Sequence, residues 1–270
     1  MSRDPVLAHR IDGAGEPLVL LNGGMMSMSS WDHLLPAFAA RFRVVRCDFR
    51  GQLLSPGTPP ADMAGHAEEV VRLLDHLAID RAHLIGTSFG AEVGLTLAAL
   101  HPALARSLVA ATATDVVSGP LRDGIGRLQA ACLDVLAGGE RDQVFDLSLP
   151  LFYSPAFLAA HRNELEARRD QVGRLPDAWF EAGERLLAAL VTLDLRRLLP
   201  RIGCPVLAIA AADDEIMPLE RMRALADAIP DARLAVVPDC GHVLVVERAG
   251  EFAKLCLDFL SEVQTQGGEK

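Results

Sequence analysis

A serine stands between two glycines in the stretch Gly86-Thr87-Ser88-Phe89-Gly90, where an apolar run gives way to helical spacing. This G-x-S-x-G pattern is typical of a nucleophile elbow, a tight strand-to-helix turn that exposes the serine hydroxyl. The flanking glycines suit such a turn because bulky neighbours would collide with its strained backbone. The start of a helix also favours developing negative charge. We therefore interpret Ser88 as a candidate nucleophile.

A serine hydroxyl needs a general base, and the base needs an acid that orients it. His242 follows an apolar run in "PDCGHVLVVE", while Asp213 and Asp214 end the preceding apolar run in "AAADDEIMP". The chain order Ser, Asp, His is one known for such triads. In an open parallel sheet, ligands gather at the carboxyl ends of the strands, where all these groups fall. The sequence thus predicts a triad and leaves two aspartates as candidates for its acid.

The elements that would position these residues alternate between strand and helix. Apolar runs predict strands at residues 17–22, 43–49, 82–87, 105–114, 204–214 and 232–242, with helical spacing between most of them. Strands that are apolar throughout and separated by helices are typical of a mostly parallel sheet covered by helices on both faces. The sequence therefore predicts an α/β protein.

One long segment breaks the strand rhythm. Residues 116–198 show only helical spacing, so we expect a helical insertion within a core formed by residues 1–115 and 199–270. Within the insertion, apolar and aromatic side chains gather at residues 144–161, where Ser154-Pro155 is typical of a helix start. Most of these side chains are expected to pack the insertion itself. Phe152 and Tyr153 are candidates to face a substrate.

Composition narrows the partners and the compartment. The formal charge of −10 disfavours nucleic acid and acidic membrane surfaces as partners. The N-terminus lacks the apolar segment of a signal peptide, and no apolar run is long enough to span a bilayer. The five cysteines are scattered and form no CxxC pair, which favours reduced thiols over disulfides or a zinc site. We expect a cytoplasmic protein without metal or cofactor, and the sequence leaves monomer and homodimer open.

Five segments together resemble the α/β-hydrolase superfamily over residues 17–260. Besides "GTSFG", residues 18–34 are similar to the oxyanion-loop segment H-G-(x)n-S-x-x-W, with Asn22 at the histidine position and Trp31 nine residues later. Residues 47–57, "CDFRGQLLSPG", are similar to the D-x-R-G-x-G-x-S loop. Residues 238–247 are similar to the G-H-x-x-x-x-E segment around the base. In the acid loop the aspartate lies four residues before a proline, which selects Asp214, with Pro218, over Asp213.

The resemblance implies roles for further residues. The backbone N–H groups of Gly24 and Phe89 would form the oxyanion hole. The insertion, residues 116–198, would be a helical lid that selects the substrate. Met25 and Met26 are candidates for an adaptable pocket wall, although ordinary core packing explains them equally well.

Departures from the family pattern also carry information. Asn22 replaces the usual histidine, and Leu53-Leu54 replace a glycine and its neighbour. A serine nucleophile disfavours epoxide hydrolase and haloalkane dehalogenase chemistry, which use aspartate. Val243 follows the base where carbon–carbon-cleaving ring-fission hydrolases often carry tryptophan, which disfavours that reaction.

We therefore expect a serine hydrolase that cleaves a small, apolar carboxylic ester or lactone through an acyl-enzyme on Ser88. Two alternatives remain open. The "LNGGM" segment also resembles that of 3-hydroxyacyl carrier-protein transferases, so the same triad could pass the acyl group to an acceptor other than water. Some hormone receptors built on this fold retain the triad, so a ligand-binding receptor is the second alternative. Acyl length, and the choice among ester, lactone and thioester, are not determined.

Overall fold

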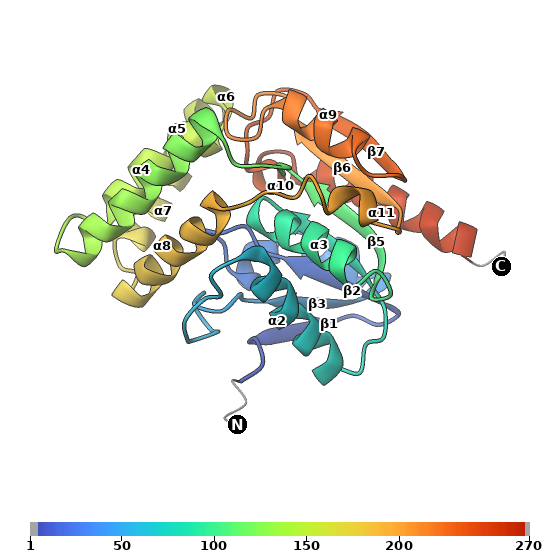
Figure 1. Cartoon of the computed structure of the whole chain (residues 1–270). Helices are drawn as coiled ribbons and strands as arrows, with labels where there is room; N and C mark the ends of the chain where they lie inside the picture. The colour runs from blue at the N-terminus through green and yellow to red at the C-terminus, as the bar shows by residue number, and fades with distance from the viewer. Residues whose placement is uncertain (1–4, 268–270) are drawn as a thin grey trace.

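The computed structural model describes residues 5–267, and within them the strands form one seven-stranded sheet in the order β1-β3-β2-β4-β5-β6-β7 (Figure 1). All neighbouring strands pair in parallel except β1 and β3. The strands are β1 (His9–Asp12), β2 (Glu16–Leu21), β3 (Phe42–Cys47), β4 (Ala82–Thr87), β5 (Ala105–Ala111), β6 (Val206–Ala211) and β7 (Ala232–Val237). The predicted α/β class with a mostly parallel sheet is confirmed.

Strand β1 is the strand, among the described residues, that the sequence did not predict. Its four residues, His-Arg-Ile-Asp, are mostly polar and only partly buried, so they lack the apolar run that identifies the other strands. β1 lies at the edge of the sheet and pairs only with β3. Arg46 of β3 reaches back to Asp12 of β1 with a 2.7 Å ion pair. Pairing with a neighbour, rather than burial, therefore defines this strand.

Alternate residues of each strand feed two apolar cores, one on each face of the sheet. Val19 and Leu21 of β2 pack with helices α2 (Met63–His76), α3 (Phe89–Leu100) and α9 (Leu219–Asp227). Leu18 and Leu20 pack on the opposite face. The elements there are η1 (Met28–Trp31), α1 (Leu35–Ala39), α10 (Leu244–Glu247) and α11 (Ala249–Gly267). Both faces are therefore covered, as a parallel sheet requires.

No helix among the described residues combines the length and apolar character needed to cross a membrane.

The segment between β5 and β6 is helical, as predicted. It contains α4 (Gly119–Leu136), α5 (Asp142–Phe152), α6 (Pro155–Ala160), α7 (Arg162–Val172) and α8 (Asp177–Val191), followed by the short η2 (Leu199–Arg201). Figure 1 shows α4, α5, α7 and α8 standing beside the sheet domain. The two ends of the insertion meet at its base, where Val116 bridges Asp194 and the N–H of Leu195 donates to the carbonyl of Asp115 at 2.7 Å. That the insertion acts as a lid stays a prediction.

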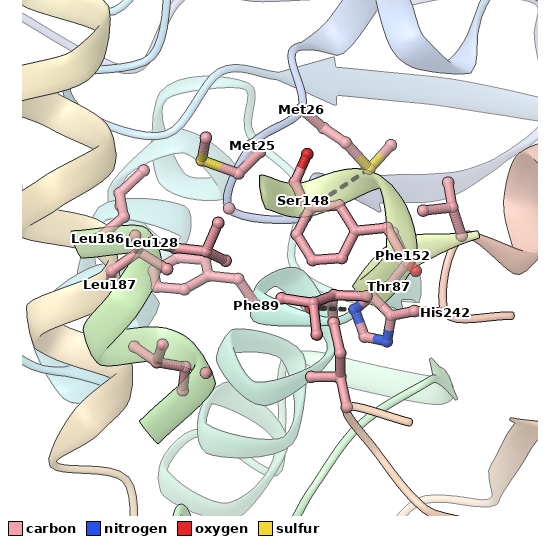
Figure 2. Close-up of a pocket in the computed structure, with 18 of the residues that line it drawn as sticks. Met25, Met26, Thr87, Phe89, Leu128, Ser148, Phe152, Leu186, Leu187 and His242 are labelled. Carbon is pink, nitrogen blue, oxygen red and sulfur yellow. Dashed lines mark hydrogen bonds between the residues drawn. The ribbon is translucent and has the colours of Figure 1, made fainter. Parts of the chain in front are cut away.

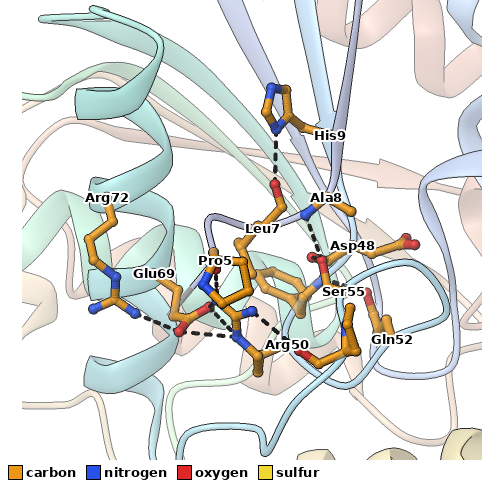
Figure 3. Close-up of polar contacts among 12 residues, drawn as sticks. Pro5, Leu7, Ala8, His9, Asp48, Arg50, Gln52, Ser55, Glu69 and Arg72 are labelled. Atoms are coloured by element: carbon orange, nitrogen blue, oxygen red, sulfur yellow. Dashed lines mark hydrogen bonds and ion pairs between the residues drawn. The ribbon is translucent and has the colours of Figure 1, made fainter. Parts of the chain in front are cut away.

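A buried ion pair fixes the loop after β3 (Figure 3). The Arg50 guanidinium lies 2.8 Å from the Glu69 carboxylate of α2, and both side chains are more than nine-tenths buried. Arg50 also donates to the carbonyls of Pro5, at 2.7 Å, and Pro56, at 3.3 Å. Charge-assisted hydrogen bonds from one guanidinium therefore join the N-terminal segment, the loop and α2.

We expect Arg50→Met to lower the free energy of unfolding by about 1–3 kcal/mol, because it removes one of the two arginines that pair with the buried Glu69 carboxylate and leaves only the half-exposed Arg72, at 2.5 Å. Urea denaturation measures this change. Lys254→Met is the matched control, since Lys254 forms an exposed ion pair with Asp258, and it should change stability little. Equal effects of the two substitutions would contradict the structural role of Arg50.

Candidate active site

Ser88 lies in a strained turn between β4 and α3. Its backbone has φ +49° and ψ −127°, a left-handed φ that side-chain-bearing residues rarely adopt. A Cβ on Gly86 would lie 2.4 Å from the carbonyl oxygen of Gly90, and one on Gly90 would lie 2.3 Å from that of Leu21. The two glycines are therefore required by close backbone approaches, and strain of this kind gathers at functional sites.

The structure brings the three predicted triad residues into one hydrogen-bonded chain. His242 Nε2 lies 3.0 Å from Ser88 Oγ, and His242 Nδ1 lies 2.8 Å from Asp214 Oδ2. The other oxygen of Asp214 accepts the backbone N–H groups of Ile216, at 2.9 Å, and Met217, at 2.8 Å. These contacts fix the orientation of the carboxylate, so that its other oxygen is aimed at the imidazole. Asp213 is exposed, so the aspartate four residues before the proline is the one that contacts the histidine.

A buried glutamate close to the triad had no signal in the motifs. Glu92 lies one turn after Ser88 in α3, is fully buried, and accepts the backbone N–H of Thr114 at 3.0 Å. Burial, together with the negative charge of Asp214, raises the pKa of Glu92 to about 8. Its carboxyl group is therefore mostly neutral at pH 7 and adds little negative charge beside Asp214. The only hint in the sequence is an acidic residue among the apolar residues of this helix.

The two predicted oxyanion donors, Gly24 and Phe89, lie close together, because a Cβ on Gly24 would be 3.7 Å from that of Phe89. Phe89 is the first residue of α3, so its N–H has no partner within the helix. The carbonyl of Gly23 accepts Gln52 Nε2 at 3.1 Å, and the same amide group reaches the Gly24 carbonyl at 3.3 Å. Because C=O and N–H point in opposite directions in a trans peptide, the Gly24 N–H points away from Gln52. Gly24 and Phe89 both line the cavity above Ser88.

Asn22, the departure from the usual histidine, belongs to the same buried network. Its side-chain amide donates to the Cys47 carbonyl at 2.8 Å and to Gln52 Oε1 at 3.1 Å. Its carbonyl oxygen accepts the indole N–H of Trp31 at 2.8 Å. Asp48 accepts the backbone N–H of Met28 at 2.6 Å. Asn22 thus supplies both a donor and an acceptor, and it links the oxyanion loop to the loop after β3. Sequence reasoning missed Gln52, because it occupies a variable position of its motif.

The Glu247 carboxylate joins the loop that carries His242 to the insertion. Glu247 accepts the backbone N–H of Ser154 at 2.9 Å, the Ser154 hydroxyl at 2.6 Å and the backbone N–H of Gly241 at 3.2 Å. The N–H of Val243 also donates to the carbonyl of Phe152 at 3.0 Å. The corner of the insertion is therefore held against the residues on both sides of His242.

A largely apolar cavity of about 360 Å³ lies above Ser88, between the sheet domain and the insertion (Figure 2). Its walls include the four pocket residues named from the sequence, Met25, Met26, Phe152 and Tyr153. The Phe152 ring covers the His242 ring, with 5.6 Å between the ring centroids. Leu128 of α4 and Leu186 and Leu187 of α8 close the end away from His242 in Figure 2. A volume at the lower end of the usual range suits a small ligand.

We expect Gln52→Leu to lower kcat by about ten- to a hundredfold with little change in KM. The reason is that the Gly24 N–H loses its fixed direction, while outright loss of an oxyanion donor costs about 10²–10³. Steady-state kinetics on nitrophenyl acetate would measure the effect, with Gln143→Leu at an exposed helix position as control. A rise in KM at constant kcat would contradict this positioning role.

Comparisons with known proteins identify the family of this chain. The family model described as the alpha/beta hydrolase fold matches residues 16–249. A protein of Caulobacter sp. (strain K31), whose name assigns it provisionally as carbamate hydrolase RutD, is 32% identical over 268 residues, covering 94% of this chain and 96% of its own. The 2-hydroxymuconate semialdehyde hydrolase of Pseudomonas sp. (strain CF600) is 30% identical over 269 residues, covering 93% and 88%. The crystal structure of the enol-lactonase from Burkholderia xenovorans LB400 is similar with a TM-score of 0.85, 26% identity, and coverage of 94% and 96%. The chain therefore belongs to the α/β-hydrolase fold family.

Proposed function

We propose that this protein is a serine hydrolase that cleaves a small carboxylic ester or lactone through an acyl-enzyme on Ser88. The observation that carries the proposal is the continuous hydrogen-bonded chain from Ser88 Oγ through both imidazole nitrogens of His242 to Asp214. It opens onto an apolar cavity that two candidate oxyanion donors also line. Similarity to an enol-lactonase favours a lactone or ester among the possible acyl compounds.

The geometry suggests the role of each group. Ser88 Oγ attacks the substrate carbonyl while His242 Nε2, 3.0 Å away, accepts its proton. The N–H groups of Gly24 and Phe89 stabilise the oxyanion of the tetrahedral intermediate, each contributing a factor of about 10²–10³. His242 then protonates the leaving alkoxide, and Asp214 stabilises the imidazolium. Water, activated by the same histidine, hydrolyses the acyl-enzyme and restores Ser88.

We expect Ser88→Ala to abolish hydrolysis of nitrophenyl esters, with a loss of several powers of ten in kcat/KM and no change in melting temperature beyond a few degrees. A fluorophosphonate should add to the wild-type protein once, at Ser88, as mass spectrometry of the digested protein would show. Ser148→Ala is the matched labelling control, because Ser148 lines the same cavity but its hydroxyl donates to the Phe145 carbonyl. Residual activity within about tenfold of wild type would overturn the assignment of Ser88.

Product analysis separates this reaction from its rivals. Acyl transfer to an added alcohol in preference to water would identify an acyltransferase. Release of one equivalent of nitrophenol without turnover would identify a receptor. A carbamate and a set of lactones belong in the same assay, because similar proteins are named for carbamate and lactone hydrolysis.

The two neighbouring aspartates should differ sharply. We expect Asp214→Asn to lower kcat by about 10⁴, because the amide favours the wrong imidazole tautomer. Asp213→Asn should change kcat little, since the Asp213 side chain is exposed. Steady-state kinetics on one ester would measure both variants, and a reversed order would make Asp213 the acid.

A further inference from the structure

The cavity is largely apolar, but solvent-exposed charged side chains also line it, and their charges are unevenly distributed. Arg127 of α4 and Arg168 of α7 line it from the insertion, and Glu215 lines it from the acid loop beside Asp214. Apart from His242, these are the charged side chains that the described residues place in the cavity wall. An anionic group on a ligand is therefore attracted toward the insertion and repelled from the acid loop.

Arg168 differs from the next arginine in the sequence. Arg169 is neutralised by two carboxylates, lying 2.6 Å from Asp142 and 2.7 Å from Asp146. Over residues 5–267, no carboxylate lies within ion-pair distance of Arg168 or Arg127. Arg168 instead donates from Nη1 to the Tyr153 hydroxyl at 3.0 Å. In a protein with a formal charge of −10, an arginine at a cavity without a counter-ion has unused capacity to bind an anion.

The Tyr153 hydroxyl orients the Arg168 guanidinium by accepting one of its hydrogen bonds. Tyr153 is 7% exposed, and its ring stacks on Phe157 with 5.1 Å between centroids. The hydroxyl oxygen accepts from Arg168, so its own hydrogen remains free to donate to a ligand. Phe152, the preceding residue, covers His242, and Glu247 holds the following residue, Ser154. The Arg168–Tyr153 pair is thus connected to the catalytic base through two adjacent, fixed residues.

We propose that Arg168 and Tyr153 form a subsite for a carboxylate, and that the substrate is a small ester or lactone carrying a free carboxylate away from the scissile carbonyl. This inference rests on the proposed ester or lactone hydrolysis. The carboxylate accepts one hydrogen bond from the guanidinium and one from the tyrosine hydroxyl. The apolar walls contact the carbon chain between the carboxylate and the reacting carbonyl. This changes the expectation of a small apolar ester, which came from the aromatic residues of the insertion, by adding one charged group to the substrate.

Two pairs of esters test the subsite, each differing only in one charge. The first pair compares mono-nitrophenyl adipate with nitrophenyl methyl adipate, and its carboxylate lies on the acyl group. The comparison of 4-acetoxybenzoate with methyl 4-acetoxybenzoate places the carboxylate on the leaving group, away from the reacting carbonyl. The ratio of kcat/KM for the charged to the neutral ester is measured for wild type, Arg168→Gln and Tyr153→Phe. The ratio cancels any loss of folded protein, because both esters are assayed on the same preparation.

In at least one pair, we expect Arg168→Gln to lower this ratio by about ten- to a hundredfold, the scale of a charge-assisted hydrogen bond. Tyr153→Phe should lower it less, because the ring and its packing remain. Arg162→Gln is the matched control: Arg162 is exposed on the same helix, does not line the cavity, and should leave the ratio unchanged. An unchanged ratio in Arg168→Gln for both pairs, with normal cleavage of the neutral esters, overturns the subsite and leaves the proposed hydrolysis intact.

Binding separates failure of the subsite from failure of the proposed reaction. If the wild-type protein cleaves none of the four esters, calorimetry with monomethyl adipate and dimethyl adipate still tests the subsite. Tighter binding of the monomethyl ester that is lost in Arg168→Gln supports it. Equal binding of the two compounds, or an equal preference in wild type and variant, overturns it.

Discussion

The strained backbone at Ser88 is the constraint on which the rest of the site depends. A side-chain-bearing residue at φ +49° persists only where its surroundings leave no alternative. Here Gly86 and Gly90 approach neighbouring backbone so closely that no Cβ fits. The backbones of β4, α3 and β2 are therefore in direct contact at this turn. The turn places the Ser88 hydroxyl beyond the end of β4, and helix α3 begins at the next residue. The proposed nucleophile and one proposed oxyanion donor therefore come from two consecutive residues.

Buried polar groups hold the remaining parts of the site to this turn. Gln52 fixes the peptide before Gly24, Asp214 is held by two backbone N–H groups, and Glu247 fastens the residues around His242. In a low-dielectric interior such hydrogen bonds are strong, and a missing partner is costly. Each loop consequently has one well-defined arrangement. This matches what catalysis by preorganised groups requires, because little reorganisation is then left for the moment of reaction.

In the proposed function, the sheet domain supplies the reacting groups and the insertion selects the substrate. Its helices cover the strand ends with apolar side chains, and Phe152 shields the imidazole on one side. The same insertion carries the unneutralised arginines of the cavity. Because α5 and α6 meet at the Tyr153-Ser154 corner, and Glu247 binds this corner to the loop that carries His242, the proposed carboxylate subsite and the proposed catalytic base share one connection.

The sequence by itself determined the features that depend on residues close together in the chain, namely the strands, the helices and the motif residues. Apolar runs and helical spacing predicted β2 to β7, and the glycines around Ser88 and the proline after Asp214 pointed to residues that the fold brings into contact. Tertiary structure decided the rest. Strand β1 exists because β3 pairs with it, and Gln52, Glu247 and Arg168 gain their partners only when segments 15 to 93 residues apart meet. The motif around His242 includes Glu247 but does not show what it binds, and Gln52 and Arg168 have no local signature, because hydrogen bonding to a distant residue leaves no periodicity in the chain.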